Sequence, residues 1–193
     1  MEDIRIAMIR DNLEGLPSYS IPPGFHIRNF RRGEERKWAE VCSSAGEFES
    51  IDTALAQFEN EFGQRLDEME NRCFFVVEDA TERIVGTAIA WIDPNFQGED
   101  YGHVHWVAIN PEFQGRKLAK PLMSAVMQRL KKSHTKAYLR THTTCLKAIN
   151  MYLDFGFVPL FVSDSCDRAW RLLADKLKHP ALIIHRKVTR NET

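Results

Sequence analysis

Two histidines, two positions apart, are the residues of this sequence best suited to acid–base chemistry. His103 and His105 lie in an apolar run, His103–Ile109, whose pattern predicts a β-strand. Side chains at positions i and i+2 of a strand point to one face, so we expect both imidazoles on the same side of a sheet, together with Val107. Histidine has an unperturbed pKa of about 6.5, which suits proton transfer near neutral pH. The pair is therefore a candidate general base; the alternative is a structural role in a partly buried strand.

The segment after this strand has the composition of a phosphate-binding turn. An Asn-Pro-Glu-Phe turn at residues 110–113 leads into Gln114, Gly115, Arg116, Lys117, Leu118 and Ala119, where a long amphipathic helical pattern starts. The first turn of a helix offers unpaired backbone N–H groups and partial positive charge, which suit a phosphate or pyrophosphate. Pro121 fits this helix if the helix starts near Leu118, because the missing N–H is then one without a helical partner.

Two stretches of the sequence resemble the GNAT superfamily of N-acetyltransferases. The passage VAINPEFQGRKLAKPLM is similar to the acyl-CoA-binding motif of that family, Gln/Arg-x-x-Gly-x-Gly/Ala after a strand. Gln114 matches its first position and Ala119 its last, whereas Lys117 replaces the central glycine.

The second stretch lies later in the chain. Ala148–Tyr152, followed by Gly156 and Phe157, resembles the Asn-x-x-Ala-Ile-x-Leu-Tyr…Gly-Phe signature of the same family, and Cys145 stands where that signature has asparagine. Two motifs at the spacing and in the element order of the family, from Phe25 to residue 162, make the resemblance specific.

The resemblance implies that the protein binds acetyl-CoA and transfers its acetyl group directly to a primary amine. In the family, strand backbone groups pair with the pantetheine arm and backbone N–H groups of the turn hold the pyrophosphate. One strand N–H would also stabilise an oxyanion. The cofactor-binding residues implied here are Val107, Ile109, Gln114, Gly115, Arg116, Lys117, Leu118, Ala119 and Cys145.

The resemblance also assigns the acid and the base. Tyr152 occupies the position whose phenol is proposed to protonate the departing thiolate, with packing as the alternative role. The His-x-His pattern is similar to that of arylalkylamine N-acetyltransferases, in which such histidines are implicated in removing the amine proton. It implies that His103, His105 or both act as base.

The acceptor would be a small-molecule or peptide amine. The segment from Ala45 to Arg72 contains eight acidic residues and only two basic ones. An acidic rim would attract a cationic amine. The interpretation favoured for most of these carboxylates is a solvated helix face, with Glu47 and Glu49 as the best exceptions. The expected loop Asp93–Gly102 is a second candidate rim.

The elements that must position these residues alternate between strand and helix periods. Strands are expected at Phe25–Phe30, Cys73–Glu78, Ile84–Trp91, His103–Ile109, Ala137–His142, 157–162 and 181–188, with a short one near Ile4–Arg10. Helices are expected at Gly33–Ala45, Ile51–Leu66, after Leu118, and at Leu146–Phe155 and 167–178. The order predicts an α+β protein. With the resemblance, it implies the GNAT fold: a mixed central sheet of six to seven strands flanked by helices. Residues 1–24 would be an N-terminal extension packed on a single domain, 25–193.

Composition excludes several other classes of protein. The chain has 193 residues, 44% of them hydrophobic, and a formal net charge of −1, which argues against non-specific nucleic-acid or membrane-surface binding. No apolar run approaches the roughly 18 residues of a membrane span, and the acidic N-terminus lacks the pattern of a secretory signal. Four separated cysteines and no metal-ligand spacing favour a cytoplasmic protein without a metal. A homodimer is left open, as is a degenerate domain that binds acyl-CoA as a sensor or scaffold without turnover.

Overall fold

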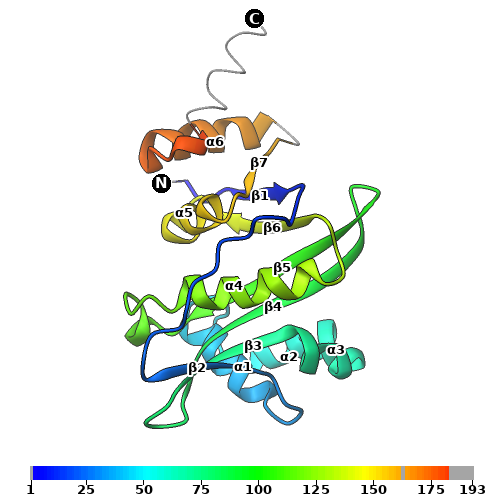
Figure 1. Cartoon of the computed structure of the whole chain (residues 1–193), viewed down its shortest axis with the longest axis vertical. Helices are drawn as coiled ribbons and strands as arrows, with labels where there is room; N and C mark the ends of the chain where they lie inside the picture. Colours follow the sequence, from blue (N-terminus) through cyan, green and yellow to red (C-terminus); the bar gives the residue numbers. More distant parts are fainter. Residues whose placement is uncertain (1, 162–163, 183–193) are drawn as a thin grey trace, which may run out of the picture.

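A seven-stranded mixed sheet forms the centre of the computed structural model, which describes residues 2–161 and 164–182. The strand order across the sheet is β2-β3-β4-β5-β6-β1-β7, and every pair is antiparallel except β5 and β6 (Figure 1). The strands are β1 (Arg5–Arg10), β2 (Phe25–Asn29), β3 (Cys73–Glu78), β4 (Ile84–Phe96), β5 (Glu99–Ile109), β6 (Ala137–His142) and β7 (Val158–Leu160). The predicted α+β class, with a mixed sheet of six to seven strands flanked by helices, is confirmed.

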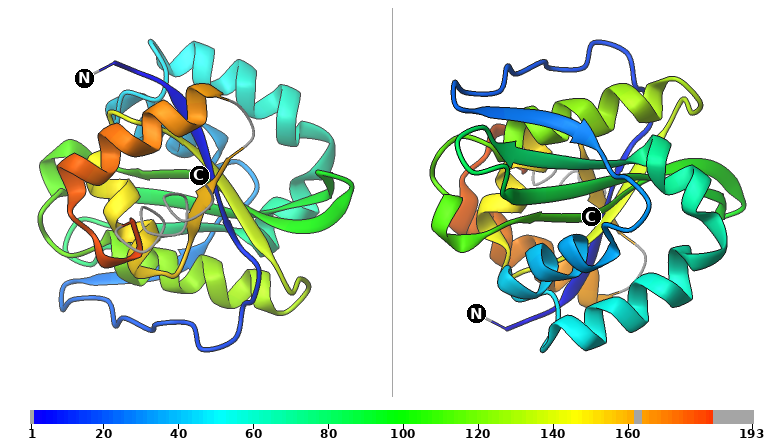
Figure 2. Two further views of the ribbon diagram at one scale, coloured as in Figure 1. Left: turned by 90° about the horizontal axis from the view of Figure 1, so that it is seen from above. Right: turned by 90° about the horizontal axis from the view of Figure 1, so that it is seen from below.

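Helices cover the two faces of this sheet, which lies between α2 and α4 (Figure 2). The helices are α1 (Glu35–Ser44), α2 (Ile51–Phe62), α3 (Leu66–Arg72), α4 (Ala119–Lys131), α5 (Leu146–Asp154) and α6 (Asp164–Leu177), with short 3-10 turns at Gly63–Arg65 and Pro111–Phe113. The face under α1 and α2 holds an aromatic cluster that includes Trp38, Phe58 and Phe62. The opposite cluster combines side chains of α4, α5, α6 and the sheet.

The sheet opens between its two parallel strands. Pairing of β5 with β6 covers three residue pairs and ends at Val104↔Leu139, although β5 runs on to Ile109. Beyond that pair, no strand of the described residues pairs with the edge of β5 that faces β6. On its other edge β5 stays paired with β4 as far as Ile109. The two strands therefore diverge and leave a gap in the middle of the sheet.

The described residues before β2 contribute a strand to the sheet. β1 lies between β6 and β7 and pairs antiparallel with both. The chain then crosses towards α4, where the backbone N–H of Tyr19 donates to Ser124 Oγ at 3.1 Å. Leu13 is buried on this path.

Several expected elements differ from the structure. The segment Asp93–Gly102 is not a loop: β4 and β5 continue into a hairpin whose two turn residues, Gln97 and Gly98, both have positive φ, as a tight primed turn requires. Phe96 stacks on Tyr138 at 3.7 Å and anchors this extension, a contact that local pattern does not reveal.

The other differences concern helix ends and the C-terminal region. The helix expected to run to Leu66 stops at Phe62, and α3 follows after the 3-10 turn. Residues 180–182 of the chain are helical, so the expected strand 181–188 does not begin there; its remainder, and position 162 of the expected strand 157–162, lie outside the described residues.

No helix within the described residues combines the length and apolar character that a bilayer crossing requires.

Candidate active site

A cavity of about 690 Å³ occupies the gap between the diverging strands. β5 and β6 form part of its lining, α5 contributes side chains from one side, and α2 with the loop before it contributes from another. Of the predicted site residues, the cavity brings together His103, His105, Val107, Cys145 and Tyr152. Residues far apart in the sequence thus meet because two strands separate.

The two histidines share one face, as predicted, but differ in their surroundings. Their rings lie 4.2 Å apart between centroids, and His103 also stacks on Tyr138 at 4.3 Å. His103 is 7% exposed. Burial, followed by the nearby charges of His105 and Arg140, lowers the pKa of His103 to about 2. His103 is therefore neutral at physiological pH and a weak base.

His105 has a carboxylate partner. Its Nε2 lies 2.5 Å from Glu61 Oε1, so the tautomer that donates from Nε2 leaves Nδ1 free to accept a proton. Trp106 Nε1 and Gln57 Nε2 each donate to Glu61 Oε2 at 3.1 Å. Burial raises the pKa of Glu61, but these hydrogen bonds and the charge of His105 lower it more, so the net pKa lies below the usual value. The carboxylate is held ionised and fixed against the imidazole.

A bulge in β5 explains why Trp106 joins this group and Val107 does not. The pairing with β4 shifts register between Thr87 and Ile89, and Trp106 has a φ of 46°. The extra residue reverses the alternation beyond this point, so Trp106 packs with the α1 and α2 cluster and Val107 with the opposite one. The expectation that Val107 shares the face of the two histidines is wrong for this reason.

Sequence reasoning missed Glu61, which it grouped with solvated carboxylates. A signal was present: Glu61 lies three residues after Phe58 and seven after Ala54, both on the buried stripe of α2. A carboxylate at that spacing faces the sheet beside the aromatic core.

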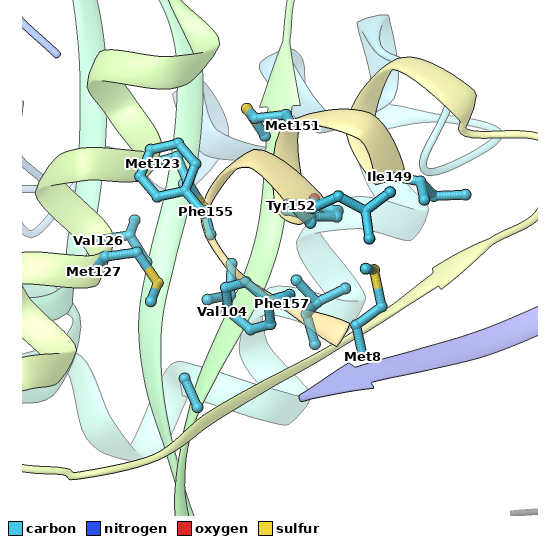
Figure 3. Packing of buried hydrophobic residues seen from close by; sticks show 14 of the residues in the cluster. Met8, Val104, Met123, Val126, Met127, Ile149, Met151, Tyr152, Phe155 and Phe157 are labelled. Atoms are coloured by element: carbon cyan, nitrogen blue, oxygen red, sulfur yellow. The ribbon is translucent and has the colours of Figure 1, made fainter. Parts of the chain in front are cut away.

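Tyr152 is buried on α5 and lines the cavity. Its side chain packs within the cluster that also holds Met8, Ile149 and Phe157 (Figure 3). Its hydroxyl has no hydrogen-bond partner among the described residues. Burial, followed by the charges of Glu47 and Cys145, raises the pKa of Tyr152 well above its usual value, so the phenol keeps its proton.

The turn before α4 is a separate part of the site. None of the backbone N–H groups from Gly115 to Ala119 donates to another group of the described residues. Gly115 has a φ of 82°, and an added Cβ there would meet no atom within 4 Å, so the backbone is open to a ligand. α4 begins at Ala119 after Leu118, as the position of Pro121 predicts. This row of free donors fits a diphosphate.

Lys117 adopts a left-handed conformation in this turn, with a φ of 62°. This backbone region favours glycine, which accounts for the glycine in the motif that the passage resembles. Gln114 Nε2 donates to the Ile109 carbonyl at 3.2 Å and ties the turn to the end of β5. Arg116 lies over the Phe113 ring at 4.6 Å. The residues from Gln114 to Ala119 do not line the cavity.

Charged residues of both signs line the cavity. Glu47 and Asp93 are among them, in line with the expected acidic rims, whereas Glu49 is not. Arg5, Arg140 and His142 also line it; they lie on β1 and β6, which the sequence did not connect to the site. Among the described residues, no cluster of three or more His, Cys, Asp or Glu side chains could hold a metal ion.

The model of a family described as "Acetyltransferase (GNAT) family" matches residues 36–157. The solved structure of a GCN5-related N-acetyltransferase from Sphaerobacter thermophilus is similar over 82% of this chain and 48% of that one, with 20% identity and a TM-score of 0.65. An acetyltransferase from the GNAT family of Colwellia psychrerythraea aligns over 82% and 54%, with 8% identity and a TM-score of 0.62.

A protein of Pyrococcus horikoshii OT3 aligns over 72% of this chain and 92% of its own, with 20% identity and a TM-score of 0.59. The chain thus spans about half the length of the Sphaerobacter and Colwellia chains that it matches. No curated protein matches the sequence.

Proposed function

The chain belongs to the acetyltransferase (GNAT) family, and from this premise we propose that it transfers the acetyl group of acetyl-CoA directly to a primary amine. The observation that carries the proposal is the cavity between β5 and β6, whose lining includes both a carboxylate-paired histidine and a protonated tyrosine. These are the two proton-handling groups that the reaction requires.

The binding of acetyl-CoA is assigned to the turn and to the open edge of β5. We assign the pyrophosphate to the free N–H groups of Gly115–Ala119, with Gln114, Arg116 and Lys117 around them. The unpaired edge of β5 from Val107 to Ile109 can pair with an extended arm as an added strand would. Cys145 lies in the cavity near Tyr152. When bound, acetyl-CoA supplies a thioester whose carbonyl carbon is open to attack by an amine nitrogen.

His105 is the proposed base. An alkylamine has a pKa near 10.4, so only about one molecule in a thousand is neutral at pH 7. A base must therefore remove a proton from the ammonium form before the nitrogen can attack. His105 offers Nδ1 while Glu61 holds Nε2, whereas buried His103 binds a proton too weakly. His103 is assigned a positioning role, stacked between His105 and Tyr138.

Tyr152 is the proposed general acid. An acid must carry its proton before it acts, and burial keeps this phenol protonated at neutral pH. Its hydroxyl has no competing partner among the described residues, so it can donate to a departing thiolate.

A second candidate is a domain that binds acyl-CoA as a sensor or scaffold without turnover. The observation in its favour is Lys117, which replaces the glycine of the motif at the proposed pyrophosphate site. Lys117 has a left-handed backbone conformation, which glycine adopts more easily.

Calorimetric titration with acetyl-CoA and an assay of CoA release with a panel of primary amines test the proposal. We expect binding and turnover in the wild type. Tyr152→Phe should lower kcat by about 100-fold with little change in acetyl-CoA affinity, because it removes only the proton donor. Tyr101→Phe is the matched control, since Tyr101 is also buried but lies outside the cavity.

The other outcomes are equally informative. Binding without turnover of any amine favours the sensor. Absence of binding at millimolar acetyl-CoA rejects both candidates, and turnover unchanged in Tyr152→Phe removes that residue from the acid role.

A further inference from the structure

We propose that the acceptor amine also carries an oxyanion, a carboxylate or a phosphate, and that Arg5 and Arg140 bind this group in the cavity. The inference rests on the proposed amine acetylation and names the class of acceptor. It derives from two guanidinium groups that line the cavity and have no carboxylate partner among the described residues.

Strand register places the two arginines together. Arg5 of β1 pairs with His142 of β6, and two positions further Ala7 pairs with Arg140. Residues opposite each other in an antiparallel pair point to one face, as do residues two apart, so both arginines share a face of the sheet. Tyr138 is on that face too and stacks on His103. The two arginines therefore lie on the same face of the sheet as the two histidines.

Neither guanidinium has a carboxylate partner in the described part of the chain. Arg5 forms no ion pair there, and Arg140 lies over the rings of Phe96 and Tyr138 at 5.6 and 5.3 Å without an acid within 4.0 Å. Asp93, an acid that also lines the cavity, accepts a hydrogen bond from the Tyr138 hydroxyl at 2.7 Å. Two exposed guanidiniums facing one cavity lack a counter-ion, and their planar donors match carboxylate and phosphate oxygens.

Two carboxylates that line the same cavity, those of Glu47 and Glu61, suit the ammonium end of the same molecule. The Glu47 carboxylate has no hydrogen-bond or ion-pair partner among the described residues. Glu61 is ionised beside His105, the proposed base. An acceptor that lies across the cavity can thus place its nitrogen near His105 and its oxyanion near Arg140, with opposite charges facing at both ends.

The test compares acceptors that differ only in the oxyanion. γ-Aminobutyrate is paired with butylamine for the carboxylate, and aminopropyl phosphate with propylamine for the phosphate. In each pair the anion is remote from the nitrogen, so the amine basicity changes little. We expect kcat/KM for at least one oxyanionic acceptor to exceed that of its plain amine by about tenfold or more, as charge-assisted hydrogen bonds allow. The pair that shows the preference identifies the anion.

Two variants and one control assign the preference to the arginines. Arg5→Gln and Arg140→Gln should each reduce the ratio of kcat/KM between oxyanionic and plain acceptor by about tenfold. Both side chains are exposed, so neither change removes core packing. Arg36→Gln removes the same charge from α1, outside the cavity, and should keep the wild-type ratio.

Equal kcat/KM within both acceptor pairs, or a ratio that survives in both cavity variants, overturns the inference while amine acetylation stands. Calorimetric binding of the four amines in the presence of CoA covers the case in which no amine is acetylated. Preferential binding of an oxyanionic amine that weakens in Arg140→Gln, without any turnover, supports this inference and rejects the proposed function. Absence of preferential binding together with absence of turnover rejects both.

Discussion

His103 and His105 carry the same imidazole on the same face of β5, yet only His105 faces a carboxylate. His103 is enclosed between two rings, and its burial disfavours the charged form so strongly that its pKa falls to about 2. His105 lies against Glu61, which is itself held by Trp106 and Gln57. Two residues of one motif thus receive different chemistry from their neighbours.

The pH dependence of the proposed reaction separates the two roles. His105→Asn should lower kcat by about 10²- to 10⁴-fold, the usual contribution of a general base. It should also remove the acidic limb of the kcat/KM profile. His103→Asn should keep that limb at its wild-type position, because His103 stays uncharged at every pH of the assay. Steady-state kinetics between pH 5 and 9 would decide, and a limb lost only in His103→Asn would reverse the assignment.

Part of this site is predictable from residue types alone. Local patterns and a family resemblance predict His103, His105 and Tyr152 as site residues, and all three line one cavity. They do not indicate Glu61, because a count of charges cannot distinguish a solvated carboxylate from one that faces a sheet. Arg140 was also missed, because its place in the cavity depends on which strands are neighbours.

At the scale of elements, the turn between β5 and α4 combines an open backbone with an unfavourable conformation. Lys117 adopts a left-handed φ of 62°, which costs an L-residue about 1–2 kcal/mol relative to glycine. Its side chain adds a positive charge beside the N–H groups of Gly115–Ala119. Lysine at this position thus lowers the stability of the fold and adds a positive charge at the proposed pyrophosphate site.

Replacing this lysine should stabilise the protein. Lys117→Gly should raise the free energy of unfolding by about 0.5–1 kcal/mol, since relief of the left-handed strain exceeds the extra entropy of glycine in the unfolded chain. Lys132→Gly is the control, because Lys132 has an ordinary φ of −69° after α4 and glycine there should destabilise. Urea unfolding of both variants measures the difference. A loss of stability in Lys117→Gly equal to that in Lys132→Gly would contradict the strain.

The same scale shows where pattern reading of the fold succeeds. Strands and helices with a clear pattern, such as β3, β6 and α5, lie where expected, because their pattern reflects burial against neighbouring elements. The hairpin end near Gln97 and the bulge at Trp106 depend on backbone conformations that residue types only weakly encode. Pairing of β1 with β6 joins residues more than a hundred positions apart, which no local period reports.

For the whole molecule, one buried carboxylate links pH to stability. Glu34, 8% exposed, accepts two hydrogen bonds of 2.7 Å from Arg28 and one of 3.0 Å from the Arg31 N–H, and Lys37 donates at 3.2 Å. Burial alone would raise the pKa of Glu34, but these partners together lower it to about 2. Glu34 precedes α1 and Arg28 lies on β2, so the contact joins sheet and helix.

A group whose pKa is lower in the folded protein stabilises it above the unfolded pKa and loses that effect as pH falls. Glu34→Gln should therefore lower the free energy of unfolding by about 3 kcal/mol at pH 7. The difference should shrink between pH 4.5 and pH 2. Urea unfolding at several pH values measures it, with Glu40→Gln, an exposed α1 residue paired with Arg36, as the control. A difference that persists unchanged at low pH would disprove the linkage.

The position of β1 between β6 and β7 also governs the order in which the chain can fold during synthesis. The first strand leaves the ribosome long before its two partners, which end at His142 and Leu160. Until then both edges of β1 stay unpaired, and exposed strand edges are templates for pairing with other chains. Three of the seven strands, β6, β1 and β7, can therefore join the sheet only after β6 has been synthesised, and the gap between β5 and β6 that forms the cavity does not exist before then. A ribosome that pauses before residue 152 would hold the nascent protein without its complete candidate site.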